Sequence, residues 1–211
     1  MKLKIGLLAL FFCAAWGTNA FAVEEATVKV ASPSLLKGEF GGTGTDMCLV
    51  SSGGFDSSFQ PVVGSTTVYS EHFASEEILT FDGKGHGTLT GTSMVIIPPP
   101  VTGFSPSASS DTFGFSFTYT VYTDSSFTYT MVPGSFSGTA LNGTLAGLTF
   151  TIDVEPTISG LIASNGATLT QATLTPTVET LTFPAISLVE PRICWRSHAS
   201  TLLKAGTEIA P

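Results

Sequence analysis

The densest group of side chains that could do chemistry combines one histidine with three carboxylates. Glu71-His72 is followed closely by Glu76-Glu77, and these residue types bind metal ions or act as general acids and bases. The other two histidines, His86 and His198, lie in a predicted turn and near the end of the chain. With one imidazole in the run, the spacing predicts a solvated acidic loop and no metal site.

Motifs of nucleophilic and phosphate chemistry do not occur in this sequence. Gly134-Ser135-Phe136-Ser137-Gly138 lacks the Gly-x-Ser-x-Gly spacing of a hydrolase nucleophile. Ser34-Leu35-Leu36-Lys37 matches a Ser-x-x-Lys dyad, but it lies in a segment predicted to be extended and its partner motifs are missing. The Gly83–Gly87 run lacks the Gly-Lys-Ser/Thr of a phosphate loop. We therefore expect no catalytic residue and no cofactor.

An aromatic stripe is the most informative pattern in the chain. Large apolar side chains alternate with small polar ones from Thr112 to Tyr122 and again from Phe127 to Met131. This period of two predicts a β-hairpin with one buried face on each strand. The ordinary interpretation is a packed core. In the alternative, four of the rings line a small apolar pocket in which tyrosine hydroxyls orient a ligand: Phe115, Phe117, Tyr119 and Tyr129.

Residues 1–22 have the features of a secretory signal peptide. Lys2 and Lys4 precede an apolar run from Ile5 to Trp16, and Ala20-Phe21-Ala22 matches a signal-peptidase site. We expect the mature chain to begin at Val23 and to be exported to the periplasm or the extracellular space. The apolar run is too short for a membrane-spanning helix, and no later segment replaces it, so no membrane span is expected.

Two cysteines remain in the expected mature chain. Cleavage removes Cys13 and leaves Cys48 and Cys194. In an oxidising compartment these two are expected to form a disulfide. The alternative is a pair of free thiols that hold a metal, but neither cysteine has a histidine or cysteine at ligand spacing.

Composition limits the class of protein. The 211 residues are 43% hydrophobic and only 11% charged, with a formal charge of −8. The length suits one domain, and the low charge content argues against a coiled coil or helical bundle. The acidic balance excludes a nucleic-acid partner, because no basic stripe is present to neutralise phosphates.

The remaining elements are expected to be strands and loops, because turn signals recur every ~8 to 12 residues and helical periodicity is absent. The first confident strand, Lys37 to Val50, carries Cys48, and the last, Arg192 to Lys204, carries Cys194. Their disulfide would bring the two strands together, as a closed barrel requires. We predict a single antiparallel up-and-down β-barrel of about eight to ten strands, with a β-sandwich as the alternative.

The expected organisation after the signal peptide is an N-terminal arm at 23–36, a barrel at 37–204 and a frayed tail at 205–211. Long loops are predicted at Ser51–Ser65 and Pro98–Ser110, the second because three consecutive prolines remove backbone donors.

Four segments together carry a resemblance: Lys37–Phe40, Cys48–Phe55, Phe81–Thr88 and Arg192–Ser197. With them the chain resembles small exported bacterial β-barrel proteins of uncharacterised function, and its shape is similar to the lipocalin-type (calycin) barrel. The resemblance implies a cavity for a small apolar ligand. The chain departs from the lipocalin Gly-x-Trp start, because Phe40 follows Gly38-Glu39.

Three functional classes follow from these observations. An exported binding protein would hold a small apolar molecule inside the barrel, whereas a structural or surface-interaction protein would have a filled interior and use its loops. An outer-membrane barrel would need a lipid-facing apolar band, which the short Thr-rich strands oppose. The sequence does not indicate an enzyme.

Overall fold

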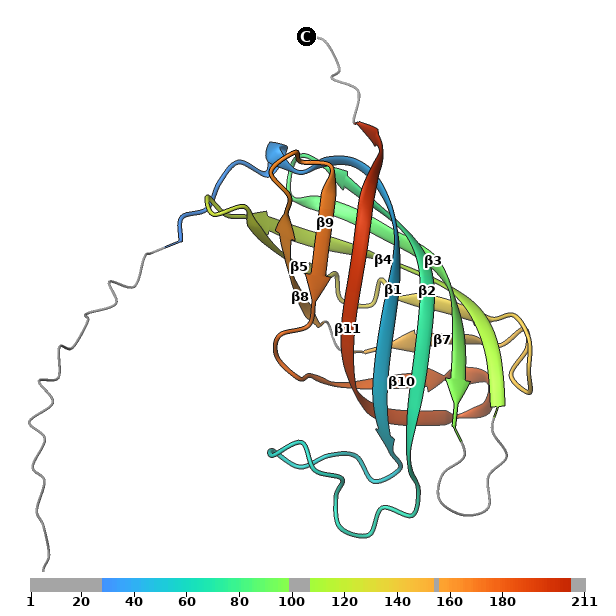
Figure 1. Cartoon of the computed structure of the whole chain (residues 1–211). Helices are drawn as coiled ribbons and strands as arrows, with labels where there is room; N and C mark the ends of the chain where they lie inside the picture. The colour runs from blue at the N-terminus through green and yellow to red at the C-terminus, as the bar shows by residue number, and fades with distance from the viewer. Residues whose placement is uncertain (1–27, 99–106, 154–155, 206–211) are drawn as a thin grey trace, which may run out of the picture.

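Eleven antiparallel strands form one sheet in the computed structural model, which describes residues 28–98, 107–153 and 156–205 (Figure 1). The strands are β1 (Lys37–Ser51), β2 (Val68–Asp82), β3 (His86–Ile97), β4 (Ser107–Val121), β5 (Ser126–Met131), β6 (Ser137–Ala140), β7 (Thr149–Ile152), β8 (Thr157–Ile162), β9 (Thr168–Ala172), β10 (Val178–Phe183) and β11 (Leu188–Ala205). The described ranges contain two short 3₁₀ turns, η1 (Pro33–Leu35) and η2 (Pro184–Ile186), and no α-helix. The predicted all-β antiparallel fold is confirmed.

The sheet closes on itself at two levels. Five long strands of 12 to 18 residues, β1 to β4 and β11, run the length of the barrel. Between β4 and β11, the short strands β5, β8 and β9 complete an upper ring, and β6, β7 and β10 complete a lower ring (Figure 1). Each ring therefore has eight strands. A barrel of about eight strands is either filled by side chains or holds one small ligand.

The strand order departs from a simple up-and-down sequence after β5. From the upper ring the chain passes to the lower ring for β6 and β7, returns for β8 and β9, and descends again for β10 before β11 spans both rings. The 11 strands of the described residues exceed the expected eight to ten because two sets of three short strands join β4 to β11, one set in each ring.

A disulfide joins the first and last strands. Cys48 and Cys194 lie directly opposite each other on β1 and β11, with their Cα atoms 4.0 Å apart and a sequence separation of 146. The predicted disulfide and the predicted contact of the two strands are both confirmed. Cys13 and the rest of the predicted signal peptide lie outside the described residues.

The aromatic hairpin is formed by β4 and β5, with Tyr119 directly opposite Tyr129. β4 begins earlier than expected, at Ser107. The prediction that the Pro98–Ser110 loop extends to Ser110 is wrong, because Ser107–Ser110 pair with Met94–Ile97 of β3 and so satisfy their backbone groups within the sheet. Residues 99–106 of that loop lie outside the described residues.

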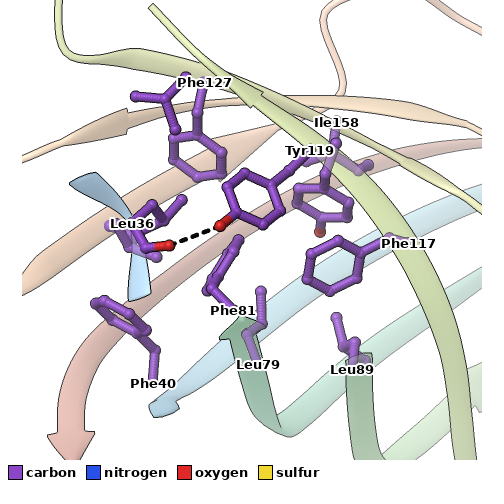
Figure 2. Packing of buried hydrophobic residues seen from close by; sticks show 12 residues of the cluster. Leu36, Phe40, Leu79, Phe81, Leu89, Phe117, Tyr119, Phe127 and Ile158 are labelled. Carbon is purple, nitrogen blue, oxygen red and sulfur yellow. Dashed lines mark hydrogen bonds between the residues drawn. The ribbon is translucent and has the colours of Figure 1, made fainter. Parts of the chain in front are cut away.

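Aromatic side chains fill the upper ring (Figure 2). The ring of Phe81 makes edge-on contacts with four others, with centroids 5.1 to 6.1 Å apart, a geometry that aromatic quadrupoles favour. The hydroxyl of Tyr119 donates a hydrogen bond of 2.8 Å to the backbone oxygen of Leu36. Leu36, which follows η1, is itself buried, so the segment before β1 covers this end of the core.

The segment before η1 also contacts the barrel. Val30 forms an isolated bridge with Tyr122, and the amide of Ala31 donates to the backbone oxygen of Val121. Within residues 28–98, 107–153 and 156–205, no helix has the length and apolar character needed to cross a membrane.

Candidate functional site

The lower ring contains a partly open cavity of about 270 Å³. Inward-facing side chains of the long strands line it together with residues of β6, β7 and β10. At one end it is bordered by Ile97, Ser107 and the Asn142–Leu145 segment that follows β6. The barrel is therefore packed in its upper ring and hollow in its lower ring.

One wall of the cavity is aromatic. The ring of Phe136 stacks on Phe113 and Phe115, with centroids 6.4 and 6.1 Å apart. Phe150 packs against Phe136 on one side and Phe183 on the other. Aliphatic side chains complete this second core cluster, and those that also line the cavity are Met131, Leu145, Ile152 and Leu181.

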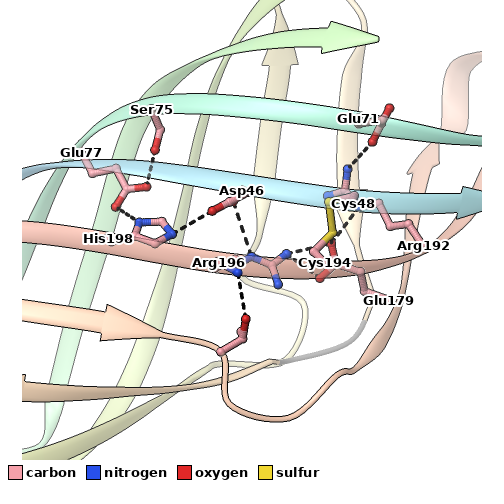
Figure 3. A network of polar contacts seen from close by, with 11 residues as sticks. Asp46, Cys48, Glu71, Ser75, Glu77, Glu179, Arg192, Cys194, Arg196 and His198 are labelled. Carbon is pink, nitrogen blue, oxygen red and sulfur yellow. Dashed lines mark hydrogen bonds and ion pairs between the residues drawn. A yellow bond between two sulfur atoms is a disulfide. The ribbon is translucent and has the colours of Figure 1, made fainter. Parts of the chain in front are cut away.

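The opposite wall is charged and is built around two arginines of β11 (Figure 3). Arg192 Nε lies 2.7 Å from Glu179 Oε1, and its Nη1 lies 3.3 Å from Glu71 Oε2. Arg196 Nη2 lies 2.6 Å from Glu179 Oε2, and its Nε lies 3.7 Å from Asp46 Oδ2. Each guanidinium is thus held between two carboxylates, and Glu179 is shared by both.

His198 continues this chain of alternating charge. Its Nε2 is 2.9 Å from Asp46 Oδ1, its Nδ1 is 2.8 Å from Glu77 Oε2, and Ser75 Oγ donates a 2.8 Å hydrogen bond to Glu77 (Figure 3). The imidazole crosses over β1 at Gly44. A Cβ on Gly44 would lie 2.5 Å from His198 Nδ1, so the missing side chain leaves the space that the imidazole occupies.

Strand register places these groups on one face. On β11 the residues with the parity of Cys194 point into the barrel, and these include Arg192, Arg196 and His198. Asp46 pairs with Arg196 across β1 and β11, so the two opposite charges sit side by side. Cross-strand pairs of opposite charge stabilise a sheet.

The network fixes the charge of its members. Although burial alone would lower the pKa of His198, its hydrogen bonds to Asp46 and Glu77 raise it to about 9. His198 is therefore an imidazolium at neutral pH and donates from both ring nitrogens. Burial alone would raise the pKa of Glu179, but Arg196 and Arg192 hold it below its usual value. Glu179 is therefore ionised.

Two other cavity carboxylates are less well compensated. Asp111 of β4 accepts a 2.7 Å hydrogen bond from Ser93 and makes no ion pair with any described residue. Burial raises its pKa. Burial likewise raises the pKa of Glu71, with Arg192 opposing the shift. Both carboxylates line the cavity.

Tyr129 lines the cavity at the boundary between the two rings. Its side chain is 3% exposed, and within the described part of the chain its hydroxyl has no hydrogen-bond partner. Burial raises its pKa, with Glu77 contributing in the same direction, so the phenol stays protonated. Among the described residues, the buried side-chain atom that lacks a hydrogen-bond partner is Oε1 of Gln171, and the Tyr129 hydroxyl is not counted with it.

The four residues predicted to bind a ligand are divided between the two rings. Phe115 and Tyr129 line the cavity. Phe117 and Tyr119 lie instead in the upper core, because the hairpin continues past the cavity and buries its far end under η1.

The acidic run around His72 is not the solvated loop that its spacing predicts. It forms part of β2, where alternation buries Glu71 and Glu77 inside the barrel and leaves His72 and Glu76 on the outer face. Sequence reasoning also missed Asp46 and the two arginines. Their shared parity with the cysteines on β1 and β11 is the signal that could have found them.

Cys48, Glu179 and Cys194 place three potential ligand atoms close together. The two sulfur atoms are bonded to each other, and thiolates rather than disulfides are the usual zinc ligands. The cluster is thus accounted for by the disulfide and by the two arginines that neutralise Glu179.

The sequence matches no protein family profile, and neither a curated protein nor a solved structure shows significant similarity to it.

Proposed function

We propose that this chain is an exported binding protein that holds one small amphiphilic molecule in the lower ring of the barrel. The observation that carries the proposal is the cavity itself, which has an aromatic wall facing a charged one. Binding sites for small molecules typically combine an apolar lining with a few fixed polar groups. The resemblance to lipocalin-type barrels points to the same function.

The size of the cavity suits a small ligand. An apolar cavity of about 150 Å³ binds benzene, and this one measures about 270 Å³. The predicted signal peptide and the Cys48–Cys194 disulfide favour an oxidising, extracytoplasmic location. The alternative role, a structural or surface-interaction protein, would give the cavity no occupant.

A pair of matched substitutions tests the proposal. Ala140 of β6 lines the cavity, whereas Ala74 of β2 lies exposed on the outer face. Ala140→Phe should fill the cavity and weaken the affinity for an apolar fluorescent dye by at least tenfold, while Ala74→Phe should leave that affinity unchanged. Circular dichroism checks that both variants fold. If neither the parent protein nor Ala74→Phe binds any apolar probe, the structural role replaces this one.

A further inference from the structure

We infer that the cavity selects amphiphiles whose polar group is a cation, such as a primary ammonium, and that Asp111 is its counter-ion. The inference rests on the proposed binding function and adds the chemical class of the ligand. It follows from how the charges along the cavity wall are paired.

Each cationic side chain of the wall is already paired with two carboxylates. Arg192 is held by Glu179 and Glu71, and Arg196 by Glu179 and Asp46. His198 is held in the same way, by Asp46 and Glu77. The carboxylate of a fatty acid would have to displace a carboxylate already in place, and leaving that group buried and unpaired is costly.

The carboxylates, in contrast, exceed the cations. Asp111 is 9% exposed, lines the cavity and is hydrogen-bonded by a hydroxyl, with no cation within ion-pair distance in the described ranges. Glu190 also lines the cavity, and its partner is likewise a hydroxyl, that of Tyr69. A buried charge is stabilised by an opposite charge more than by a neutral donor. An ammonium group supplies that charge.

An aromatic ring of the cavity wall follows Asp111 on the same face of β4. Phe113 lies two residues from Asp111 on the inner face of β4. Its ring adds a π surface, which attracts cations within about 6 Å.

Three probes of equal chain length separate the head-group preference from binding itself. Octylamine, octan-1-ol and octanoate are titrated into the mature protein at pH 7 by isothermal calorimetry. We expect octylamine to bind at least tenfold more tightly than octanoate, with octan-1-ol between them. Equal or tighter binding of octanoate would overturn the inference while leaving the proposed function intact. If none of the three probes binds, both this inference and the proposed binding function are wrong.

Asp111→Asn tests the counter-ion directly, with Glu76→Gln on the outer face of β2 as the matched loss of one negative charge. Asp111→Asn should bring the affinity for octylamine down to that for octan-1-ol while octan-1-ol still binds, and Glu76→Gln should change neither. Retention of the full octylamine preference by Asp111→Asn would exclude Asp111 from the role. If this variant does not fold, the comparison of the three probes on the parent protein still decides the head-group preference.

Discussion

Replacing Glu179 by glutamine should destabilise the protein strongly although the two side chains have nearly the same shape. The Glu179 side chain is 0% exposed and contacts both arginines, at 2.7 Å from Arg192 Nε and 2.6 Å from Arg196 Nη2. Glutamine removes the charge that both guanidinium groups share. Glu71 and Asp46 remain as partners, but at 3.3 and 3.7 Å. Removing one partner of a buried ion pair costs about 3–5 kcal/mol.

Urea unfolding followed by circular dichroism measures this loss. With a denaturant slope of about 2 kcal/mol/M, the midpoint of Glu179→Gln should fall by roughly 2 M. Glu76→Gln removes the same charge from an exposed position of β2, and it should stay within about 0.5 kcal/mol of the parent protein. A loss below about 1 kcal/mol for Glu179→Gln would refute the conclusion that Glu179 is the shared counter-ion of the network.

Two further predictions concern His198. The folded-state pKa of His198 is about 9, above the usual 6.5, so its contribution to stability should be complete below pH 6.5 and disappear as the pH rises through 9. The difference in unfolding free energy between the parent protein and His198→Gln should therefore shrink over that pH range. An NMR titration midpoint at or below 6.5 for the imidazole would contradict this prediction. Gly44→Ala should destabilise the protein by about 1–3 kcal/mol in the same urea assay, because the new Cβ would lie 2.5 Å from His198 Nδ1. Strand propensity alone would favour alanine over glycine. A variant more stable than the parent protein would show that the imidazole moves at no cost.

Much of the fold could be predicted from local pattern. Strict alternation identified the β4–β5 hairpin, because each of its strands has one buried face. The two mature cysteines allowed a single pairing, and that pairing implied contact between the first and last strands. Both are properties of a few residues and need no knowledge of the rest of the chain.

The two-level arrangement could not be predicted in the same way. β6 and β7 have four residues each, so alternation in such strands is too short to indicate which neighbours they pair with. Their partners are chosen by tertiary packing, where Phe150 and Phe136 meet in the lower core.

The charged wall was missed for a different reason. Charged residues are usually exposed, so Glu71 and Glu77 were assigned to solvent. Their burial depends on cations that arrive from β11, more than a hundred residues later in the chain: the separation is 121 residues for both Glu71–Arg192 and Glu77–His198. Composition and local sequence pattern do not reveal pairs that are so far apart in the chain.

A crystal structure of the mature protein grown with octylamine tests directly whether the lower-ring cavity is the binding site. We expect one octylamine molecule in the lower ring, with its chain against Phe115 and Phe136, its nitrogen within hydrogen-bond distance of Asp111, and the upper ring unchanged. A lower ring without octylamine, in crystals grown well above the dissociation constant measured in solution, would contradict the claim that this cavity is the binding site.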